Sequence, residues 1–184
     1  MEMLYQQKLN QPQMDGVWQL LLRYGDTFVP PLSSRNSTCQ QGLQPSVSAS
    51  AQGPTAYFQE LQKQQFLLSL EGERITGFLS FRRNFVPEIL EKQREDGFLG
   101  LYVTTLIVDA NFRRQGVARS FYGRLLTLWP TERRLISTRT WSGNTGHIAL
   151  LETLGFAGPI RIPDDRGPGI DTVYYYKLLG EDAT

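Results

Sequence analysis

The stretch that most constrains the fold of this chain spans residues 99–128, where an apolar segment, a short basic turn and a helical pattern follow one another. Residues 99–108 are mostly apolar, which is typical of a buried strand. The turn at 113–118 reads Arg-Arg-Gln-Gly-Val-Ala, and apolar side chains then recur with helical spacing as far as Leu128. Backbone N–H groups at the start of a helix lack intrahelical partners, and the helix dipole adds partial positive charge there. This order of elements therefore predicts a site for a phosphate group.

The overall composition excludes several other classes of protein. The 184 residues are enough for one domain with a full hydrophobic core, and 40% hydrophobic with 20% charged residues favours a globular chain. A net charge of +1 gives no basic excess, so neither nucleic acid nor an anionic membrane surface is expected as a partner. Cys39 is the one cysteine, which fits a reducing compartment. No signal peptide or apolar membrane span is recognised, so the expected location is the cytoplasm.

Hydrophobic periodicity and turn residues predict helices and strands on both sides of the central stretch. Residues 1–12 are predicted to hold a first strand ending at Pro12. Residues 26–54 contain four prolines and are predicted to form a long loop or a lid. Further helices are expected at 14–22, ending at Gly25, at 56–64 with Thr55 as N-cap, and at 144–154, a helical turn at 87–93, and strands at 66–70, 75–81, 134–140, 156–162 and 170–179. The expected fold is one α/β domain of the α+β type, residues 1–184, with a mixed, mostly antiparallel sheet flanked by helices and one β-α-β crossover.

Two common phosphate-binding loops do not fit the basic turn. A P-loop requires a glycine, four spacer residues and then Gly-Lys-Ser/Thr, and this turn has no such lysine. A dinucleotide fingerprint requires three glycines at fixed spacing, whereas the turn contains Gly116 alone, with Ala118 two residues later.

The pattern Arg-x-x-Gly-x-Ala at 113–118 resembles the motif that opens a helix after a central strand in the GNAT superfamily of acyl-CoA-dependent N-acetyltransferases. A second segment, Asn144 with Ala149, Leu150 and Glu-Thr-Leu-Gly-Phe at 152–156, is similar to that family's Asn…Ala-Leu-Tyr-Glu-x-Leu-Gly-Phe helix. The two segments occur in the family's order, and the resemblance covers about residues 66–156. It implies a GNAT-like sheet whose crossover forms a coenzyme A site, with acetyl-CoA as co-substrate. No metal is expected, because the one histidine and the one cysteine are far apart in the sequence and give no ligand cluster.

The resemblance also implies roles for named residues of the coenzyme site. The pyrophosphate of coenzyme A is expected on the turn, formed by Arg113, Arg114, Gln115, Gly116, Val117, Ala118 and Arg119. The pantetheine arm is expected along the free edge of the central strand at Leu106, Ile107 and Val108, where this strand diverges from the 134–140 strand. A backbone N–H near Leu106 or Ile107 would polarise the thioester carbonyl. Asn144 is either a contact of the pantetheine or acetyl end, an ordinary N-cap, or both.

The catalytic positions depart from the family pattern. Many members place Glu or Asp on the central strand, but here Thr104 and Thr105 stand there, which cannot accept a proton near neutral pH and could hold a water. The position of the usual acidic Tyr on the second helix is Leu151. Tyr174, on the last strand, is the candidate substitute, and strand alternation places Tyr175 on the opposite face. His147 is either a base or, as we favour, a surface residue of the helix.

The resemblance leaves the acceptor open. The leading hypothesis is transfer of acetyl from acetyl-CoA to a primary amine of a small molecule by direct attack in a ternary complex. The alternatives are a protein or peptide amine, favoured by an open groove, and a non-catalytic acyl-CoA sensor; a closed acidic pocket would favour a small cationic amine. Loops 26–54 and 163–169 are predicted to bound the acceptor pocket. The oligomeric state is left open, with a homodimer as one alternative. Acidic residues expected on the acceptor side are Asp26, Glu60, Asp164 and Asp165.

Overall fold

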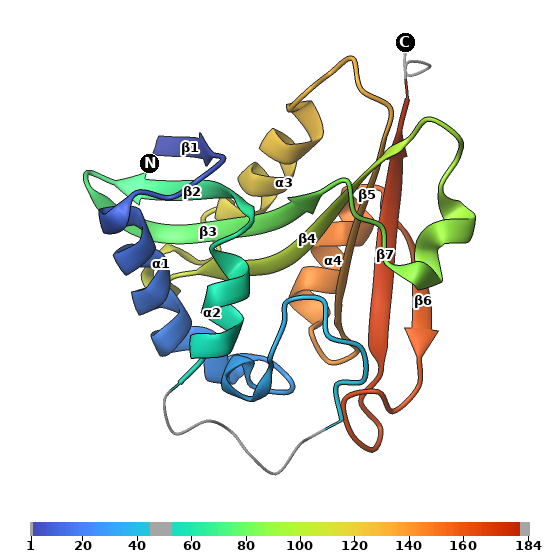
Figure 1. The fold of residues 1–184 in the computed structure, drawn as a ribbon, viewed down its shortest axis with the longest axis horizontal. Helices are drawn as coiled ribbons and strands as arrows, with labels where there is room; N and C mark the ends of the chain where they lie inside the picture. The colour runs from blue at the N-terminus through green and yellow to red at the C-terminus, as the bar shows by residue number, and fades with distance from the viewer. Residues whose placement is uncertain (1, 45–52, 181–184) are drawn as a thin grey trace.

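The computed structural model describes residues 2–44 and 53–180, which form a mixed α/β structure around a seven-stranded sheet (Figure 1). The strands lie in the order β1-β2-β3-β4-β5-β7-β6. Neighbouring strands are antiparallel except β4 and β5, which are parallel and joined by α3, so the predicted sheet and crossover are confirmed. The elements are β1 (Glu2–Gln6), α1 (Gln11–Tyr24), α2 (Thr55–Leu61), β2 (Gln65–Glu71), β3 (Arg74–Arg83), β4 (Leu99–Val108), α3 (Val117–Thr127), β5 (Arg134–Trp141), α4 (Thr145–Thr153), β6 (Ala157–Ile162) and β7 (Thr172–Leu179).

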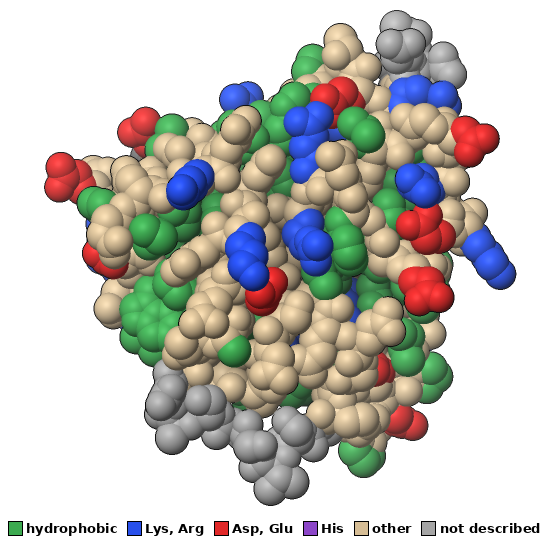
Figure 2. All heavy atoms as spheres, viewed as in Figure 1, with side chains coloured by type: hydrophobic (Ala, Val, Ile, Leu, Met, Phe, Trp, Pro, Cys, Tyr) green, Lys and Arg blue, Asp and Glu red, His purple; other side chains and the backbone are tan. Residues whose placement is uncertain are grey.

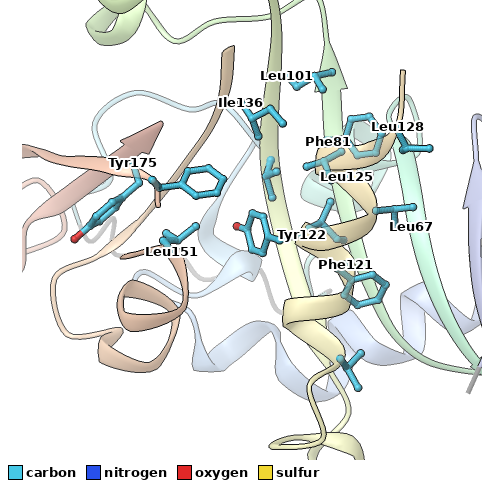
Figure 3. Packing of buried hydrophobic residues seen from close by; sticks show 14 of the residues in the cluster. Leu67, Phe81, Leu101, Phe121, Tyr122, Leu125, Leu128, Ile136, Leu151 and Tyr175 are labelled. Atoms are coloured by element: carbon cyan, nitrogen blue, oxygen red, sulfur yellow. The ribbon is translucent and has the colours of Figure 1, made fainter. Parts of the chain in front are cut away.

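Helices cover both faces of the sheet (Figure 1). α1 and α2 pack on one face, where Val17 and Leu21 of α1 belong to the same hydrophobic cluster as Phe66 of β2 and Phe78 of β3. α3 and α4 pack on the other face, and Figure 3 shows the buried side chains of α3 facing the strands. Tyr175 belongs to this second cluster, whereas Tyr174 packs on the opposite face, as strand alternation predicts.

Two predicted boundaries at the N-terminal side were wrong. β1 ends at Gln6 rather than at Pro12, because Asn10 begins a helix: its side chain accepts from the Gln13 N–H in a capping box. Pro12 therefore lies in the first turn of α1, where a missing N–H is tolerated. Thr55 is the first residue of α2 rather than its N-cap, which is Pro54. The part of the predicted 26–54 loop or lid at residues 45–52 lies outside the described residues.

The C-terminal end of α3 is held by a buried side chain from the strand that follows. Arg134 is only 2% exposed. Its guanidinium donates to the carbonyl oxygens of Leu125, Leu126 and Leu128. These carbonyls have no partner within the helix, and a cation is favourable at this end of the dipole. Arg134 thereby fixes α3 on β5, and with it the turn at the other end of the helix.

Candidate functional site

The site is organised by a divergence of the two central strands. β4 pairs with β5 only from Leu99 to Val103, although β4 continues to Val108 and β5 to Trp141. The predicted splay of these strands is therefore confirmed. On its other side β4 carries a bulge: Thr105 pairs with Ser80 and Val103 with Phe81, which leaves Thr104 as an extra residue. Bulges bend a strand and redirect a side chain, so the free edge of β4 begins at an irregular position.

A cavity of about 360 Å³ lies where the strands diverge. One wall is residues 103–108 of β4, and the facing wall is residues 138–141 of β5 with Asn144 and His147 of the following helix. The predicted residues Thr104, Thr105, Leu106, Ile107, Val108, Arg113 and Asn144 all lie along this one cavity.

The basic turn after β4 forms a second, shallower depression of about 280 Å³. Arg113, Arg114, Gly116, Val117, Ala118 and Arg119 line it, whereas Gln115 turns back to donate to the Asn111 carbonyl. Gly116 is the N-cap of α3 at φ +80°, without a side-chain hydrogen bond to the helix start. A Cβ at Gly116 would meet no atom within 4 Å. Uncapped N–H groups, exposed guanidinium groups and open space fit a pyrophosphate.

A buried carboxylate fixes the entry to this turn. Asp109, 1% exposed, accepts from the backbone N–H of Asn111 and from Arg23 and Arg74 at 3.0 and 2.8 Å. Burial alone would raise the pKa of Asp109, but these donors outweigh it and hold the pKa below its usual range. Arg113, in turn, donates to the Val108 carbonyl and packs over the ring of Tyr24.

Both loops predicted to bound the acceptor pocket reach the cavity. Arg35 lines it from the 26–44 segment, and Arg166 lines it from the loop before β7. The two loops also contact each other, since Leu43 N–H donates to Asp165 and the Gln44 side chain to the Asp164 carbonyl; Figure 1 shows them side by side below the sheet. The acidic residues expected on the acceptor side do not line this cavity: these are Asp26, Glu60, Asp164 and Asp165.

Comparison with known proteins settles the family. The model of the acetyltransferase (GNAT) family matches residues 37–156. The chain belongs to the GNAT family. It is accordingly an acyl-CoA-dependent acetyltransferase with acetyl-CoA as co-substrate. No curated protein sequence matches it.

Solved GNAT structures share the fold at low sequence identity. NAA60 of Arabidopsis thaliana, in complex with a bisubstrate analogue, is 15% identical with a TM-score of 0.65, over 96% of this chain and 98% of that one. An N-acetyltransferase of Staphylococcus aureus is 16% identical (TM-score 0.61, 97% and 99% covered). A ribosomal-protein alanine N-acetyltransferase of Escherichia coli is 14% identical (TM-score 0.60, 100% and 99% covered).

Asn144 of this GNAT protein occupies the N-cap position of α4 but does not cap it. Its side chain makes no hydrogen bond to the helix start and donates instead from Nδ2 to the Thr140 hydroxyl at 2.9 Å. The N-cap alternative is therefore correct in position only. The bond to β5 holds the amide at the border of the cavity.

The two threonines of the GNAT strand are fixed in a network of hydroxyl groups. Thr104 donates to Gln64 Oε1 at 2.6 Å and lies 2.9 Å from the Ser80 hydroxyl. Thr105 Oγ1 lies 2.8 Å from the hydroxyl of Tyr57, a fully buried side chain of α2. Burial raises the pKa of Tyr57, although Arg35 nearby partly offsets this. Tyr57 was not predicted as a site residue, because an inward aromatic on a short helix has the pattern of core packing.

The remaining candidate, Tyr174, lies beyond the far side of Arg139. Its hydroxyl accepts from Arg139 Nη1 at 3.3 Å. Tyr174 lines a different cavity, of about 570 Å³, together with Tyr102 and Cys39, and Arg139 borders both cavities. The structure thus brings Thr104 and Thr105 together and separates Tyr174 from them by one guanidinium group.

His147 is half-buried rather than the exposed surface residue that we favoured from the sequence. Its Nε2 lies 2.8 Å from the Tyr122 hydroxyl, and the side chain borders the cavity between the strands. Burial lowers the pKa of His147 to about 4, so the imidazole is neutral at pH 7. The described residues contain no group of three or more His, Cys, Asp or Glu side chains placed to hold a metal ion, and no described helix could cross a membrane.

Proposed function

We propose that this GNAT protein transfers the acetyl group of acetyl-CoA to the primary amine of a small molecule, by direct attack within a ternary complex. The observation that carries the proposal is the cavity at the divergence of β4 and β5. It joins the free edge of β4, which would bind the pantetheine, to the two loops that would bind the acceptor. One continuous space could therefore hold donor and acceptor at once, as direct transfer requires.

In the proposed reaction the amine nitrogen attacks the thioester carbonyl carbon, and the coenzyme leaves as a thiolate that takes up a proton. A backbone N–H at Leu106 or Ile107 would stabilise the developing oxyanion. Deprotonating a lysine-like ammonium at pH 7 costs about 4–5 kcal/mol. Thr104 and Thr105, held by Gln64 and Tyr57, could position a water that carries this proton away.

Enclosure of the acceptor side favours a small acceptor over a protein. The two loops that line the cavity are hydrogen-bonded to each other. Arg35 and Arg166, which line it from these loops, are only 6% and 2% exposed. The solved structures keep the protein alternative in view, because the Escherichia coli enzyme is by its name a ribosomal-protein acetyltransferase. At this sequence identity the likeness concerns the fold alone.

The single cysteine supports our further proposal of a cytoplasmic location.

The proposal is tested by mixing the protein with acetyl-CoA and a panel of small amines and short peptides, while free thiol is followed. We expect thiol release with at least one class of small amine and none above background with peptides. Faster turnover of peptides would overturn the small-molecule assignment. Tight binding of acetyl-CoA without turnover of any amine would support the sensor alternative instead.

A further inference from the structure

Three arginines converge on the acceptor side of the cavity from three separate parts of the chain. Arg35 comes from the segment after α1, Arg139 from β5 and Arg166 from the loop before β7, and all three line the cavity that also contains Thr104. No Asp or Glu is among the residues that line it. On the face shown in Figure 2, by contrast, basic and acidic side chains are interspersed.

The hydrogen bonds within the protein use only part of each guanidinium group. Arg35 donates from Nε and Nη2 to the Pro30 carbonyl, and Arg166 from Nη1 to the Val29 carbonyl. Arg139 donates to the Gln40 carbonyl at 2.6 Å and to a tyrosine hydroxyl. Within residues 2–44 and 53–180, Arg35 Nη1, Arg166 Nη2 and Arg139 Nε have no hydrogen-bond partner. All their hydrogen-bond partners among these residues are neutral, so none of the three guanidinium groups forms a direct ion pair.

Carboxylates elsewhere in the described chain do not neutralise the cluster. None lies within 4.0 Å of a nitrogen of these three side chains, whereas seven other ion pairs are formed. Asp165 acts on Arg166 through the Thr172 hydroxyl, which accepts from Arg166 Nε and donates to Asp165. Asp165 lines the larger cavity and not this one. Residues 45–52 contain no acidic residue in their sequence.

Burying like charges together is unfavourable unless an opposite charge joins them. Burial together with Arg35 and Arg139 lowers the pKa of the Arg166 guanidinium to about 9, although Asp165 partly offsets this. Burial also lowers the pKa of Arg35, whereas the surrounding tyrosine hydroxyl groups outweigh burial at Arg139 and raise its pKa. If the three arginines only held the fold together, uncharged hydrogen-bond donors would serve equally well, because their partners are backbone carbonyl and hydroxyl oxygens. Planar guanidinium groups with free N–H donors are the preferred partners of carboxylate and phosphate groups.

We propose that the acceptor is an amine that also carries an oxyanion, a carboxylate or a phosphate, and that this anion binds among Arg139, Arg35 and Arg166. The inference rests on the proposed acetyl transfer and names the class of its acceptor. It replaces the cationic amine that a closed acidic pocket would have indicated. The arginines would hold the anionic end of the acceptor while its amine faces Thr104 and the edge of β4.

The same charges address the lack of a carboxylate base on β4. Positive groups near an ammonium favour its neutral form and lower its pKa. An acceptor bound among three guanidinium groups would therefore lose its proton more easily than in water. The nitrogen then forms its bond to the acetyl carbon, the carbon–sulfur bond breaks, and the released proton passes to water while the thiolate is protonated. No further reactant is required.

The test uses pairs of amines with and without the anion, an amino acid against its carboxamide and phosphoethanolamine against ethanolamine, and compares their rates at equal concentrations of the neutral amine, because loss of the anion also changes the pKa of the amine. With acetyl-CoA saturating, kcat/KM is measured from thiol release for the wild type, for Arg139→Gln and Arg139→Lys, and for Arg124→Gln. Arg124 is an exposed residue of α3 that lines neither cavity, so it controls for loss of one positive charge. Thermal unfolding verifies that each variant is folded, and calorimetry separately measures its affinity for the coenzyme.

We expect at least a tenfold preference for the anionic member of one pair, expressed mainly in KM. The pair concerned identifies the anion as carboxylate or phosphate. The preference should fall to less than threefold in Arg139→Gln, recover in part in Arg139→Lys and persist in Arg124→Gln. The pH at which the rate reaches half its maximum should rise in Arg139→Gln, because the bound ammonium then keeps its proton to higher pH.

Several results would overturn the inference while leaving the acetyl transfer standing. These are faster turnover of the uncharged members, an equal preference in wild type and Arg139→Gln, or a loss of coenzyme affinity in Arg139→Gln, which would assign the arginines to the coenzyme phosphates. Preferential use of succinyl-CoA with neutral amines would assign them to the acyl group. Absence of thiol release with every amine would instead refute the proposed function itself.

Discussion

The coenzyme turn can be tested by making the same glycine-to-alanine change at two positions, one in the turn and one, as a control, within the helix that follows. Gly116 lies at the start of α3 with φ +80°, and Gly123 lies within α3. A Cβ at either position would meet no atom within 4 Å, so neither change creates a clash with the protein. The two variants Gly116→Ala and Gly123→Ala therefore differ in backbone conformation and in what faces the added methyl group.

The expected effects on stability have opposite signs. An L-residue in the left-handed region costs about 1–2 kcal/mol, whereas Ala in place of Gly in a helix interior gains about 0.8–1.0 kcal/mol. The free energies of unfolding of the two variants should thus differ by about 2–3 kcal/mol. For a chain of this size that separates their melting temperatures by about 4–12 °C. Urea and thermal unfolding of both variants beside the wild type measure the difference.

The same pair should separate in coenzyme affinity. The methyl group of Gly116→Ala would occupy the open depression of the turn, where we place the pyrophosphate, so we expect coenzyme A to bind at least tenfold more weakly by calorimetry. Gly123→Ala should bind it as the wild type does. Unchanged affinity in Gly116→Ala, with the expected loss of stability, would refute the phosphate assignment. A free energy of unfolding of Gly116→Ala equal to that of the wild type would refute the argument that position 116 requires a left-handed backbone.

Two further expectations concern buried groups outside the turn. Arg134→Met removes the donors to three carbonyls at the end of α3 and should lower the free energy of unfolding by about 2–4 kcal/mol. The control Arg133→Met, at the exposed neighbouring position, should change the free energy of unfolding by less than about 0.5 kcal/mol. Urea unfolding of both variants measures the difference. The pKa of His147 falls from 6.5 to about 4 on folding, so below pH 6.5 the unfolded chain takes up a proton that the folded chain resists. Stability should therefore decline from pH 6.5 to pH 4 by up to about 1.4 kcal/mol per pH unit, and His147→Gln should show a shallower decline. Equal slopes would contradict the neutral imidazole.

The features that were predictable from the sequence are those fixed by neighbouring residues. The strand at 99–108 and the helix after the basic turn follow from local periodicity and agree with β4 and α3. The boundary errors at Pro12 and Thr55 arise because caps depend on which residue leaves the helix first, and several polar residues compete for that position.

The features that were missed depend on contacts across the fold. The bulge at Thr104 is an offset between β4 and β3, so it exists only in the pairing of the two strands. Arg35, Arg139 and Arg166 are far apart in sequence and meet because β7 pairs with β5 and two loops fold over their ends. The helical periodicity of the sequence places His147 on the exposed side of its helix. In the structure its imidazole is instead hydrogen-bonded to the Tyr122 hydroxyl on the neighbouring helix.

The short pairing between β4 and β5 divides the sheet into two mechanical halves. Strands β1 to β4 form one antiparallel ladder and β5, β7 and β6 another, joined by five residue pairs at Leu99 to Val103. Beyond that seam the halves separate, and a molecule seated between them would touch both at once. Its binding free energy then adds to the cohesion of the halves. We therefore expect a bound substrate to make the unfolding of the two halves more cooperative.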